Sequence, residues 1–523
     1  MKRFYLLVCI LTLHLSITAQ ENIDITLQLN TNDINTSIGD NSIGKKIATS
    51  SIISKDEGHV IYAKRNSNSE IIWYLTIQVS GAKAIVPYFD ELIIEDGAKI
   101  RAYSTSTKKS TRFFYHNENA LSNSFALPLI KGENIVIEAT FPNQAAFDKF
   151  KLSISEVGAL YSLQGFGDAP ACYANVNCSE GNPWQDQIRS VAKYMIVEGT
   201  TIAYCTGSLI NNTNQDFKNY FLSAQHCGMA STTAEFGQFV FYFNYEANSC
   251  SSPANDNGLD QETVVGCTKI SSSGTSTSLP PDGSDFLLME LNAIPASYNV
   301  YYAGWNRADI PQIQGNGAII QHPRADLKKI SFWSTVNVSF SSLSHLEVLC
   351  ISSANGEGIV EPNSSGSPIF DGNKNVIGNV TAGSEGCISD SPVNSAFAVG
   401  GRFSEHWNQN GSTPNLQLKP WLDPTNSGVM SLNGKQQFGP VGINEGYLNN
   451  TDFNIFPNPT SQFIAIEADK IIEKVNLYSL DGKLLLSVTK ANNIDVSELH
   501  SGVIIVEIYF KNGEKAHNRV YKQ

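Results

Sequence analysis

An all-β fold is indicated by the way apolar and turn-forming residues alternate along this chain. Short runs rich in Val, Ile, Thr, Phe and Tyr recur between clusters of Gly, Asn, Ser and Asp, which is typical of strands joined by turns. Charged residues make up only 16% of the sequence, so apolar residues suffice for extensive burial. With 523 residues, the chain is long enough for several domains, each with its own core.

The first residues predict export. Lys2 and Arg3 precede the apolar run FYLLVCILTLHL, and a small residue follows at Ala19, so residues 1–19 are expected to be a secretory signal peptide. The run is too short to span a bilayer, and no later segment suggests a transmembrane helix. A formal net charge of −13 without a Lys/Arg cluster argues against a nucleic-acid partner.

Residues 20–168 are expected to form a β-sandwich. They contain no cysteine and show strand-like alternation, for example in IIWYLTIQV at 71–79 and ENIVIEATF at 133–141. No acid–base constellation and no metal-ligand spacing is visible in this region, so its composition predicts a fold but no chemistry.

Residues 169–434 form a cysteine-rich unit. Apart from Cys9 in the signal peptide, all cysteines fall between Cys172 and Cys387. Because no C-x-x-C pair occurs and the chain is exported, disulfides are favoured over zinc sites. No metal and no organic cofactor is expected.

The stretch EPNSSGSPIFDG at 361–372 reads either as a turn or as the site of a serine nucleophile. A nucleophile needs a base and an orienting acid. His226 follows the apolar run at 220–223, and Asp285 begins the apolar run at 286–289. A carboxylate that enters a core needs a partner, and an imidazole Nδ1–H would supply one. The chain order His, Asp, Ser is the order found in chymotrypsin.

Several motifs carry a resemblance to a known family. The segments CTGSLINNT, FLSAQHCGM, SDFLLMEL and EPNSSGSPIF, with YAGWNRAD at 302–309 and PWLDPTNSG at 420–428, resemble the lysyl endopeptidase family. This family is a bacterial branch of the chymotrypsin-like serine proteases, and the resemblance covers essentially all of 169–434. It implies a double β-barrel with the site in the cleft between the barrels, and protein or peptide substrates.

The resemblance also assigns roles. It implies that Ser365 is the nucleophile, with His226 as base and Asp285 as the orienting acid. The backbone N–H groups of Asn363 and Ser365 would form the oxyanion hole. Asn363 stands where the family has glycine, which requires a backbone position with an unusual φ, and Asn tolerates such a position next best.

The family pattern further implies three disulfides, Cys172–Cys387, Cys178–Cys250 and Cys205–Cys227. Cys267 and Cys350 have no counterparts in this pattern, so whether they form a fourth bridge stays open.

The substrate pocket departs from the family pattern. Thr381, Gly383 and Ala398 are its expected residues, and Ala398 aligns with the aspartate that meets a substrate lysine. An unpaired buried ammonium is costly, so strict lysine specificity is not expected. No lysine lies between Lys151 and Lys193, so self-cleavage after lysine at the expected junction is excluded. A small or medium apolar substrate residue is preferred, and Asp390 keeps lysine specificity open as the alternative.

The flanking regions follow from position and resemblance. Residues 20–168 resemble a prodomain that assists folding and covers the cleft, although a permanent binding domain stays open. After a linker at 435–451, residues 452–523 read as a small β-sandwich with DG and NG turns. PNP at 457–459, LYSLDGK at 477–483 and the segment 494–502 resemble the Ig-like sorting domain of the type IX secretion system. This implies export through the outer membrane with that machinery as partner; an adhesion module is the alternative.

The overall expectation is a secreted or surface-attached serine endopeptidase. The alternatives are a true lysyl endopeptidase and a catalytically silent surface adhesin. The remaining histidines of the cysteine-rich unit, such as His322, His345 and His406, have no evident acid–base partner and are expected to be structural or solvent-facing.

Overall fold

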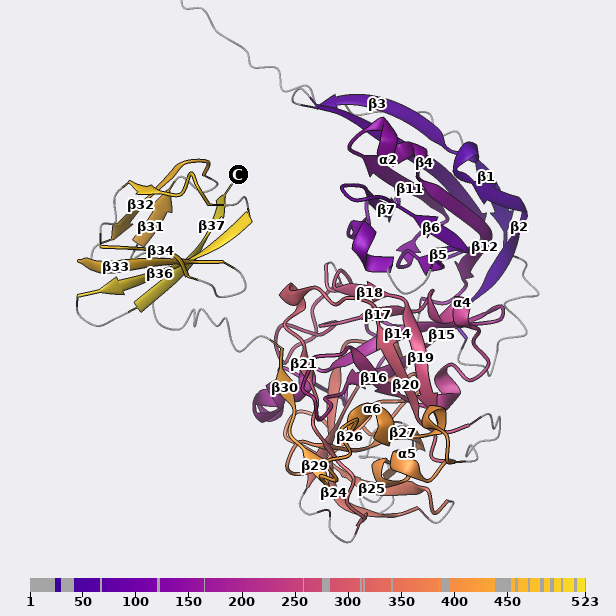
Figure 1. Ribbon diagram of the computed structural model, residues 1–523. Coiled ribbons are helices and arrows are strands. Elements are labelled where there is room, and N and C mark those ends of the chain that lie inside the picture. The colour runs from indigo at the N-terminus through magenta and orange to yellow at the C-terminus, as the bar shows by residue number, and fades with distance from the viewer. Residues whose placement is uncertain are drawn as a thin grey trace, which may run out of the picture. The chain divides into compact units, whose positions relative to one another are not determined.

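The computed structural model describes residues 24–29, 42–437 and 453–522, with short gaps inside the two longer ranges. It divides into two compact units, Met1–Gln437 and Phe438–Gln523 (Figure 1). The division falls close to the predicted domain end at 434. The predicted signal peptide at 1–19 and residues 438–451 of the predicted linker lie outside the described residues.

The N-terminal part of the first unit is a two-layered β-structure, as expected. The predicted strands at 71–79 and 133–141 are β4 and β11, which pair antiparallel with Leu75 opposite Ile137, both fully buried. One sheet contains β1 (Ile25–Gln28), β3 (His59–Arg65), β4 (Asn68–Ser80), β7 (Lys99–Tyr103), β8 (Phe114–Tyr115) and β11 (Asn134–Phe141). The other layer contains β2 (Gly44–Ser54), β5 (Ala84–Phe89), β6 (Glu91–Ile93), β9 (Phe125–Ala126), β10 (Ile130–Lys131) and β12 (Lys151–Leu160). Short helices η1 (Lys55–Glu57), η2 (His116–Asn119) and α2 (Gln144–Asp148) complete it.

The first barrel of the cysteine-rich unit closes through a bent strand. Its strands pair in the order β18-β17-β14-β15-β16-β20-β19, and β18 and β19 are separated only by Gly266. Gly266 has a φ of +83°, and a Cβ there would lie 2.6 Å from Asn292 Nδ2, so glycine allows the bend. The strands are β14 (Val191–Glu198), β15 (Thr201–Leu209), β16 (Tyr220–Ser223), β17 (Val240–Tyr242), β18 (Thr263–Val265), β19 (Cys267–Ser272) and β20 (Leu287–Leu291).

The second barrel closes by direct pairing. Its strands follow the order β26-β23-β24-β25-β28-β27, and an additional pairing of β26 with β27 completes the ring. The strands are β23 (Gly317–Gln321), β24 (Lys329–Val338), β25 (His345–Ile351), β26 (Pro368–Phe370), β27 (Val376–Gly383) and β28 (Phe397–Arg402). The expected all-β, double-barrel architecture is therefore confirmed.

Short elements surround the two barrels. The minor strands are β13 (Ala174–Asn175), β21 (Tyr301–Tyr302), β22 (Trp305–Asn306), β29 (Ser431–Leu432) and β30 (Lys435–Gln436). The helices are η3 (Ser179–Trp184), α3 (Gln185–Ile188), η4 (Gln225–Cys227), α4 (Thr233–Phe236), η5 (Ala296–Tyr298), η7 (Pro323–Ala325), α5 (Phe403–Asn408), η10 (Pro414–Leu416) and α6 (Lys419–Leu422).

Two of the expected disulfides are present, Cys178–Cys250 and Cys205–Cys227. Cys172 is also disulfide-bonded, and its expected partner Cys387 lies outside the described residues. The open question about a fourth bridge is answered, because Cys267 and Cys350 are free buried thiols in different apolar clusters.

The second unit is a β-sandwich of seven strands within its described residues. One sheet contains β31 (Phe453–Phe456), β32 (Phe463–Ala468) and β35 (Ile494–Asp495); the other contains β33 (Ile472–Tyr478), β34 (Leu484–Val488), β36 (Gly502–Phe510) and β37 (Lys515–Lys522). Alternate residues of these strands, such as Ile464, Val475 and Val506, form its buried core. The PNP segment at 457–459 lies outside the described residues. No helix in the described parts of the chain is both long and apolar enough to cross a membrane.

Candidate active site

His226 is held on a short helical turn at the end of β16. Its neighbours in η4, Gln225 and Cys227, are fully buried, and Cys227 is joined to Cys205 on β15. Just before the turn, Ser223 Oγ donates to the Thr206 carbonyl over 2.7 Å. The backbone of the turn is therefore pinned to β15, while the imidazole itself stays partly exposed.

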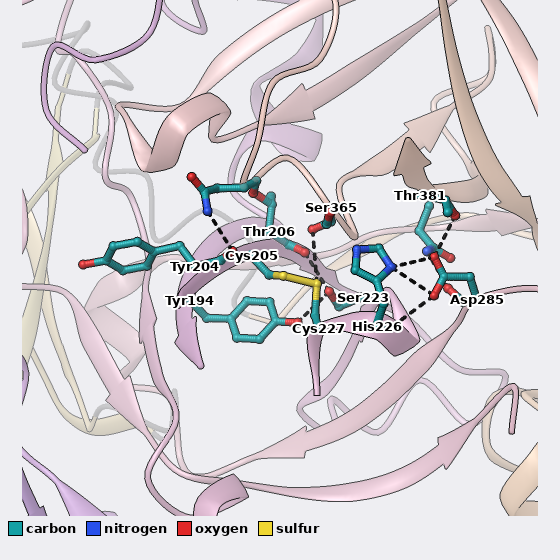
Figure 2. The surroundings of a disulfide bond; sticks show 12 residues. Tyr194, Tyr204, Cys205, Thr206, Ser223, His226, Cys227, Asp285, Ser365 and Thr381 are labelled. Atoms are coloured by element: carbon teal, nitrogen blue, oxygen red, sulfur yellow. Dashed lines mark hydrogen bonds and ion pairs between the residues drawn. A yellow bond between two sulfur atoms is a disulfide. The ribbon is translucent and has the colours of Figure 1, made fainter. Parts of the chain in front are cut away.

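Asp285 supplies the partner that the sequence demanded. It lies two residues before the start of β20 and is fully buried. Its Oδ2 lies 2.9 Å from His226 Nδ1, and its Oδ1 also accepts the His226 backbone N–H over 3.2 Å. The hydroxyl of Thr381 donates to the same Oδ2 over 2.7 Å. The expected carboxylate–imidazole contact is present (Figure 2).

This contact shifts the pKa of both groups. Burial alone would raise the pKa of Asp285, but the His226 charge and the hydrogen bonds from His226 and Thr381 outweigh it and hold the pKa below its usual value. Burial would lower the pKa of His226, yet the attraction and hydrogen bond of Asp285, helped by Glu198, raise it above its usual value. The pair therefore favours a carboxylate beside an imidazole that is ready to accept a proton.

A buried network of hydrogen bonds holds the backbone at Asp285 and at the residue before it. Its φ of +57° is unusual for a residue other than glycine. Asn379 Nδ2 donates to the Asp285 carbonyl over 2.9 Å, and Asn379 Oδ1 lies 2.7 Å from His406 Nε2. His406 Nδ1 in turn lies 2.7 Å from Ser284 Oγ. The strained backbone is thus held on both sides of Asp285 by hydrogen-bonded neighbours.

Ser365 lies in the turn that leads into β26. Its carbonyl accepts the Thr206 N–H over 2.9 Å. The next residue, Gly366, has a φ of +82°, and a Cβ there would lie only 2.0 Å from Ser223 Oγ. Only glycine permits this close approach, which brings Ser365 next to the His226 turn. Figure 2 shows the imidazole between Ser365 and Asp285, with Nδ1 on the Asp285 side.

The turn also presents two free backbone donors. Asn363 has the expected left-handed conformation, with a φ of +74°. Its side chain donates to the Tyr204 carbonyl over 3.1 Å, and its carbonyl accepts from Thr206 Oγ1 over 2.9 Å. Among the residues that the structure describes, neither the Asn363 N–H nor the Ser365 N–H has a hydrogen-bond acceptor. Unpaired N–H groups at a nucleophile and two residues before it can form an oxyanion hole.

These residues surround a cavity of about 470 Å³. Of the expected residues, His226, Asn363, Ser365, Thr381 and Gly383 line it. Ala398 does not: it is fully buried opposite Gly383 in the β27–β28 pair. Asp390, the alternative carboxylate, lies outside the described residues.

The other lining residues were not expected from the sequence, and Glu198, Val360 and Glu361 are among them. Glu361 is paired with Arg324 at 2.9 Å. It belongs to the quoted stretch EPNSSGSPIFDG, so proximity to the serines was its only signal. Glu198 ends β14 and has no motif around it.

The cysteine-rich unit has recognisable relatives. Residues 166–397 match the family described as "Lysyl endopeptidase, C-terminal domain". This segment is therefore similar to lysyl endopeptidases over the length of that match. A curated "Lysyl endopeptidase" from Pseudomonas aeruginosa strain PAO1 is 29% identical over 284 residues, which covers 50% of this chain. The chain spans 57% of the length of that relative.

Solved structures give a distant comparison. Protease Anisep from Arthrobacter nicotinovorans is 15% identical, with 43% of this chain and 96% of that chain covered and a TM-score of 0.28. A Glu endopeptidase is 17% identical, with 45% and 92% covered and a TM-score of 0.27. The double-barrel assignment of residues 169–434 therefore rests on the chain's own strand pairing.

The second unit matches a separate family. Residues 454–522 match the family described as "Secretion system C-terminal sorting domain". The expected sorting domain is thus confirmed, and with it the expectation that the protein is exported, either released or attached to the cell surface.

Proposed function

We propose that this protein is a secreted serine endopeptidase. It would cleave peptide bonds by means of a Ser365–His226–Asp285 triad, with an acyl-enzyme as intermediate. The observation that carries the proposal is the juxtaposition of two arrangements at one cavity. The first is the hydrogen-bonded series of Thr381, Asp285 and His226, and the second is the pair of unpaired N–H groups at Asn363 and Ser365.

Each group has a definite task in this mechanism. His226 Nε2 takes the proton from Ser365 Oγ while the oxygen attacks the substrate carbonyl carbon. The carbonyl oxygen becomes an oxyanion that accepts hydrogen bonds from the Asn363 and Ser365 N–H groups. The imidazolium then protonates the leaving amine, the C–N bond breaks, and the acyl group stays on Ser365. Water, activated by His226, releases the acyl group and restores the serine.

Asp285 makes His226 the base in this scheme. Because Nδ1 donates to Asp285, the neutral ring has its lone pair on Nε2, on the side that faces away from Asp285. The raised pKa of His226 supports this role, since the imidazolium formed during attack is stabilised by the buried carboxylate.

The pocket supports a preference for small or medium apolar substrate residues. A Cβ on Gly383 would lie 2.7 Å from Val360 Cγ2, so the Val360 side chain lies directly against the Gly383 backbone. Ile359, Val360 and Ala398 belong to one apolar cluster. Of the two carboxylates that line the cavity, Glu361 is already paired with Arg324, and Glu198 belongs to β14 rather than to this wall. A lysine ammonium placed here would be buried without a partner, which is costly.

Cleavage-site mapping by mass spectrometry tests the proposal. The protein and a Ser365→Ala control are incubated with a denatured protein mixture, and new termini are identified. Cuts after small or medium apolar residues support the full proposal. Cuts confined to the carboxyl side of lysine support the lysyl endopeptidase alternative and contradict the pocket assignment. Equal, background-level cutting by both proteins contradicts the enzyme and favours the adhesin.

A variant that gains cleavage after lysine would distinguish an incorrect pocket assignment from an inactive enzyme. Ala382→Asp would place a carboxylate at a residue that lines the cavity, and we expect it to raise cleavage after lysine. Ala382→Asn is the matched control, since it adds similar bulk without charge.

A further inference from the structure

The N-terminal sandwich and the first barrel share one continuous sheet. β2 of the sandwich pairs antiparallel with β15 of the barrel, with Gly44 opposite Ile202 and Lys45 opposite Thr201. The Ile43 N–H donates to the Ile202 carbonyl and the Lys46 N–H to the Thr200 carbonyl, each over 2.8 Å. Backbone pairing of this kind joins the two parts as neighbouring strands are joined within a domain.

Apolar packing reinforces the pairing. A Cβ on Gly158 would meet Tyr88 Cε2 at 2.8 Å, Ile202 Cδ1 at 3.0 Å and Val86 Cβ at 3.0 Å. The Ile202 side chain therefore fills a socket formed by the sandwich residues Val86, Tyr88 and Gly158. All of the apolar residues at this contact are buried and belong to one core cluster that spans both parts. Stable interfaces are built around such fully desolvated anchors.

Polar contacts also link the sandwich to the barrel unit. Lys131 Nζ of the sandwich lies 2.8 Å from Asp256 Oδ2 of the barrel unit. Arg112 Nη2 donates to the Thr263 carbonyl over 2.7 Å, and Ser124 Oγ donates to the Ala234 carbonyl over 3.0 Å. The interface thus combines buried apolar residues with an ion pair and hydrogen bonds, as specific protein–protein contacts do.

The same strand also forms a wall of the candidate active site. Thr201 and Ala203 of β15 line the cavity beside His226 and Ser365, whereas Ile202, between them, points into the sandwich socket. Neighbouring residues on a strand face opposite sides, so the sandwich buttresses the wall from behind. The cavity lining is drawn entirely from residues 196–383, and none of it comes from the described residues of the sandwich.

We propose that the N-terminal sandwich is a permanent docking partner of the protease barrels, one that stays bound after the connector at 162–171 is cut and leaves the active site open. The mature protein would be a two-fragment complex whose smaller fragment holds β15 in place. In this proposal the sandwich supports β15 and does not cover the cleft, unlike the prodomain expected from the sequence. The part of the proposal that concerns an open active site rests on the proposed endopeptidase function.

The connector offers a direct test. A site for a specific protease is inserted after Ser162, the full chain is cut there, and the products are analysed by size-exclusion chromatography and native mass spectrometry. We expect the two fragments to co-elute as one complex with peptide-hydrolysing activity equal to that of the uncut chain. Separation of the fragments overturns the proposal, and so does activity that rises only after the sandwich is removed.

A Ser365→Ala version separates the two proposals. Its fragments should stay together without any activity, so association is measured independently of catalysis. If the Ser365 form is also inactive but its fragments stay together, the endopeptidase proposal fails while docking stands.

The ion pair across the interface provides a second measurement. Lys131→Asp and Asp256→Lys should each raise the dissociation constant of the cut complex about 5-fold, and the double variant should recover part of this loss. Lys149→Asp is the matched control, because Lys149 pairs with Glu95 inside the sandwich, at 3.1 Å. Equal effects of Lys131→Asp and Lys149→Asp would contradict the docking surface.

Discussion

Thr381 donates its hydroxyl hydrogen to Asp285 Oδ2 over 2.7 Å, the same oxygen that lies 2.9 Å from His226 Nδ1. Thr381 was expected to line the substrate pocket, and it does line the cavity, but its hydroxyl is committed to the buried carboxylate. Its side chain therefore orients the acid of the proposed triad.

Removal of this hydroxyl should weaken catalysis without unfolding the protein. Thr381→Val keeps the shape and deletes one hydrogen bond to a buried charge, so we expect kcat/KM to fall roughly 10-fold, mainly through kcat. Thr381→Ser keeps the donor and should retain most of the activity. Steady-state kinetics on a peptide substrate measure both, and equal losses in the two variants would contradict the orienting role.

The negative charge of Glu198 should affect how kcat/KM depends on pH. His226 acts as a base only when neutral, so activity is lost as pH falls through its pKa, which is raised above 6.5 by Asp285 and by Glu198. In Glu198→Gln the negative charge is gone, the pKa of His226 falls, and the acid limb of kcat/KM should move to lower pH. Glu290→Gln, on β20, serves as the control with an unmoved limb. A shift of the Glu198→Gln limb to higher pH would contradict the assignment.

Val360 should control the size of the accepted substrate residue. Because its side chain lies against Gly383, Val360→Ala opens space in the pocket wall. We expect the ratio of kcat/KM for a substrate leucine to that for alanine to rise roughly 10-fold. Val348→Ala changes the same apolar cluster, but Val348 does not line the cavity. This control should leave the ratio unchanged, and a similar change in both variants would point to general loosening of the barrel.

The Cys205–Cys227 bridge should matter for both stability and catalysis. It closes a loop over a sequence separation of 22 and anchors the His226 turn to β15. Replacing both cysteines by serine should lower the free energy of unfolding by about 3 kcal/mol and reduce kcat of the folded enzyme. The Cys178–Cys250 bridge lies outside the site, so its removal should lower stability but spare kcat. Thermal unfolding and active-site titration separate the two effects, and an unchanged kcat without Cys205–Cys227 would contradict the anchoring role.

Local patterns were sufficient to predict much of this molecule. The alternation at 71–79 placed β4, because one face of that strand is buried and the other is not. The demand of a buried carboxylate for a partner led from Asp285 to His226. A family resemblance supplied the disulfide partners and the left-handed backbone at Asn363.

Contacts between distant segments were not predictable in the same way. The Thr381 hydroxyl meets a carboxylate 96 positions away, and no local pattern marks which side of β27 it faces. The seating of Ile202 against Gly158 depends on an edge pairing between β2 and β15, which carries no local sequence signal. The Val360–Gly383 contact likewise depends on how a turn packs against a strand.

Three histidines were expected to be structural or solvent-facing; they are buried rather than solvent-facing, and they should affect how the protein responds to acid. His322, His345 and His406 are fully buried, and burial lowers the pKa of each, for His406 to about 3. In the unfolded chain His406 takes up a proton near pH 6.5, whereas in the folded protein it stays neutral down to about pH 3. The free energy of unfolding is therefore highest above pH 6.5 and decreases as the pH falls from 6.5 toward 3. One such group contributes a slope of about 1.4 kcal/mol per pH unit in that window. Chemical unfolding of the Ser365→Ala protein, which cannot digest itself, should show this decline. His406→Gln, which can still hydrogen-bond Asn379 but does not titrate, should make the slope shallower by about that amount, and an unchanged slope would show that His406 takes up a proton while folded.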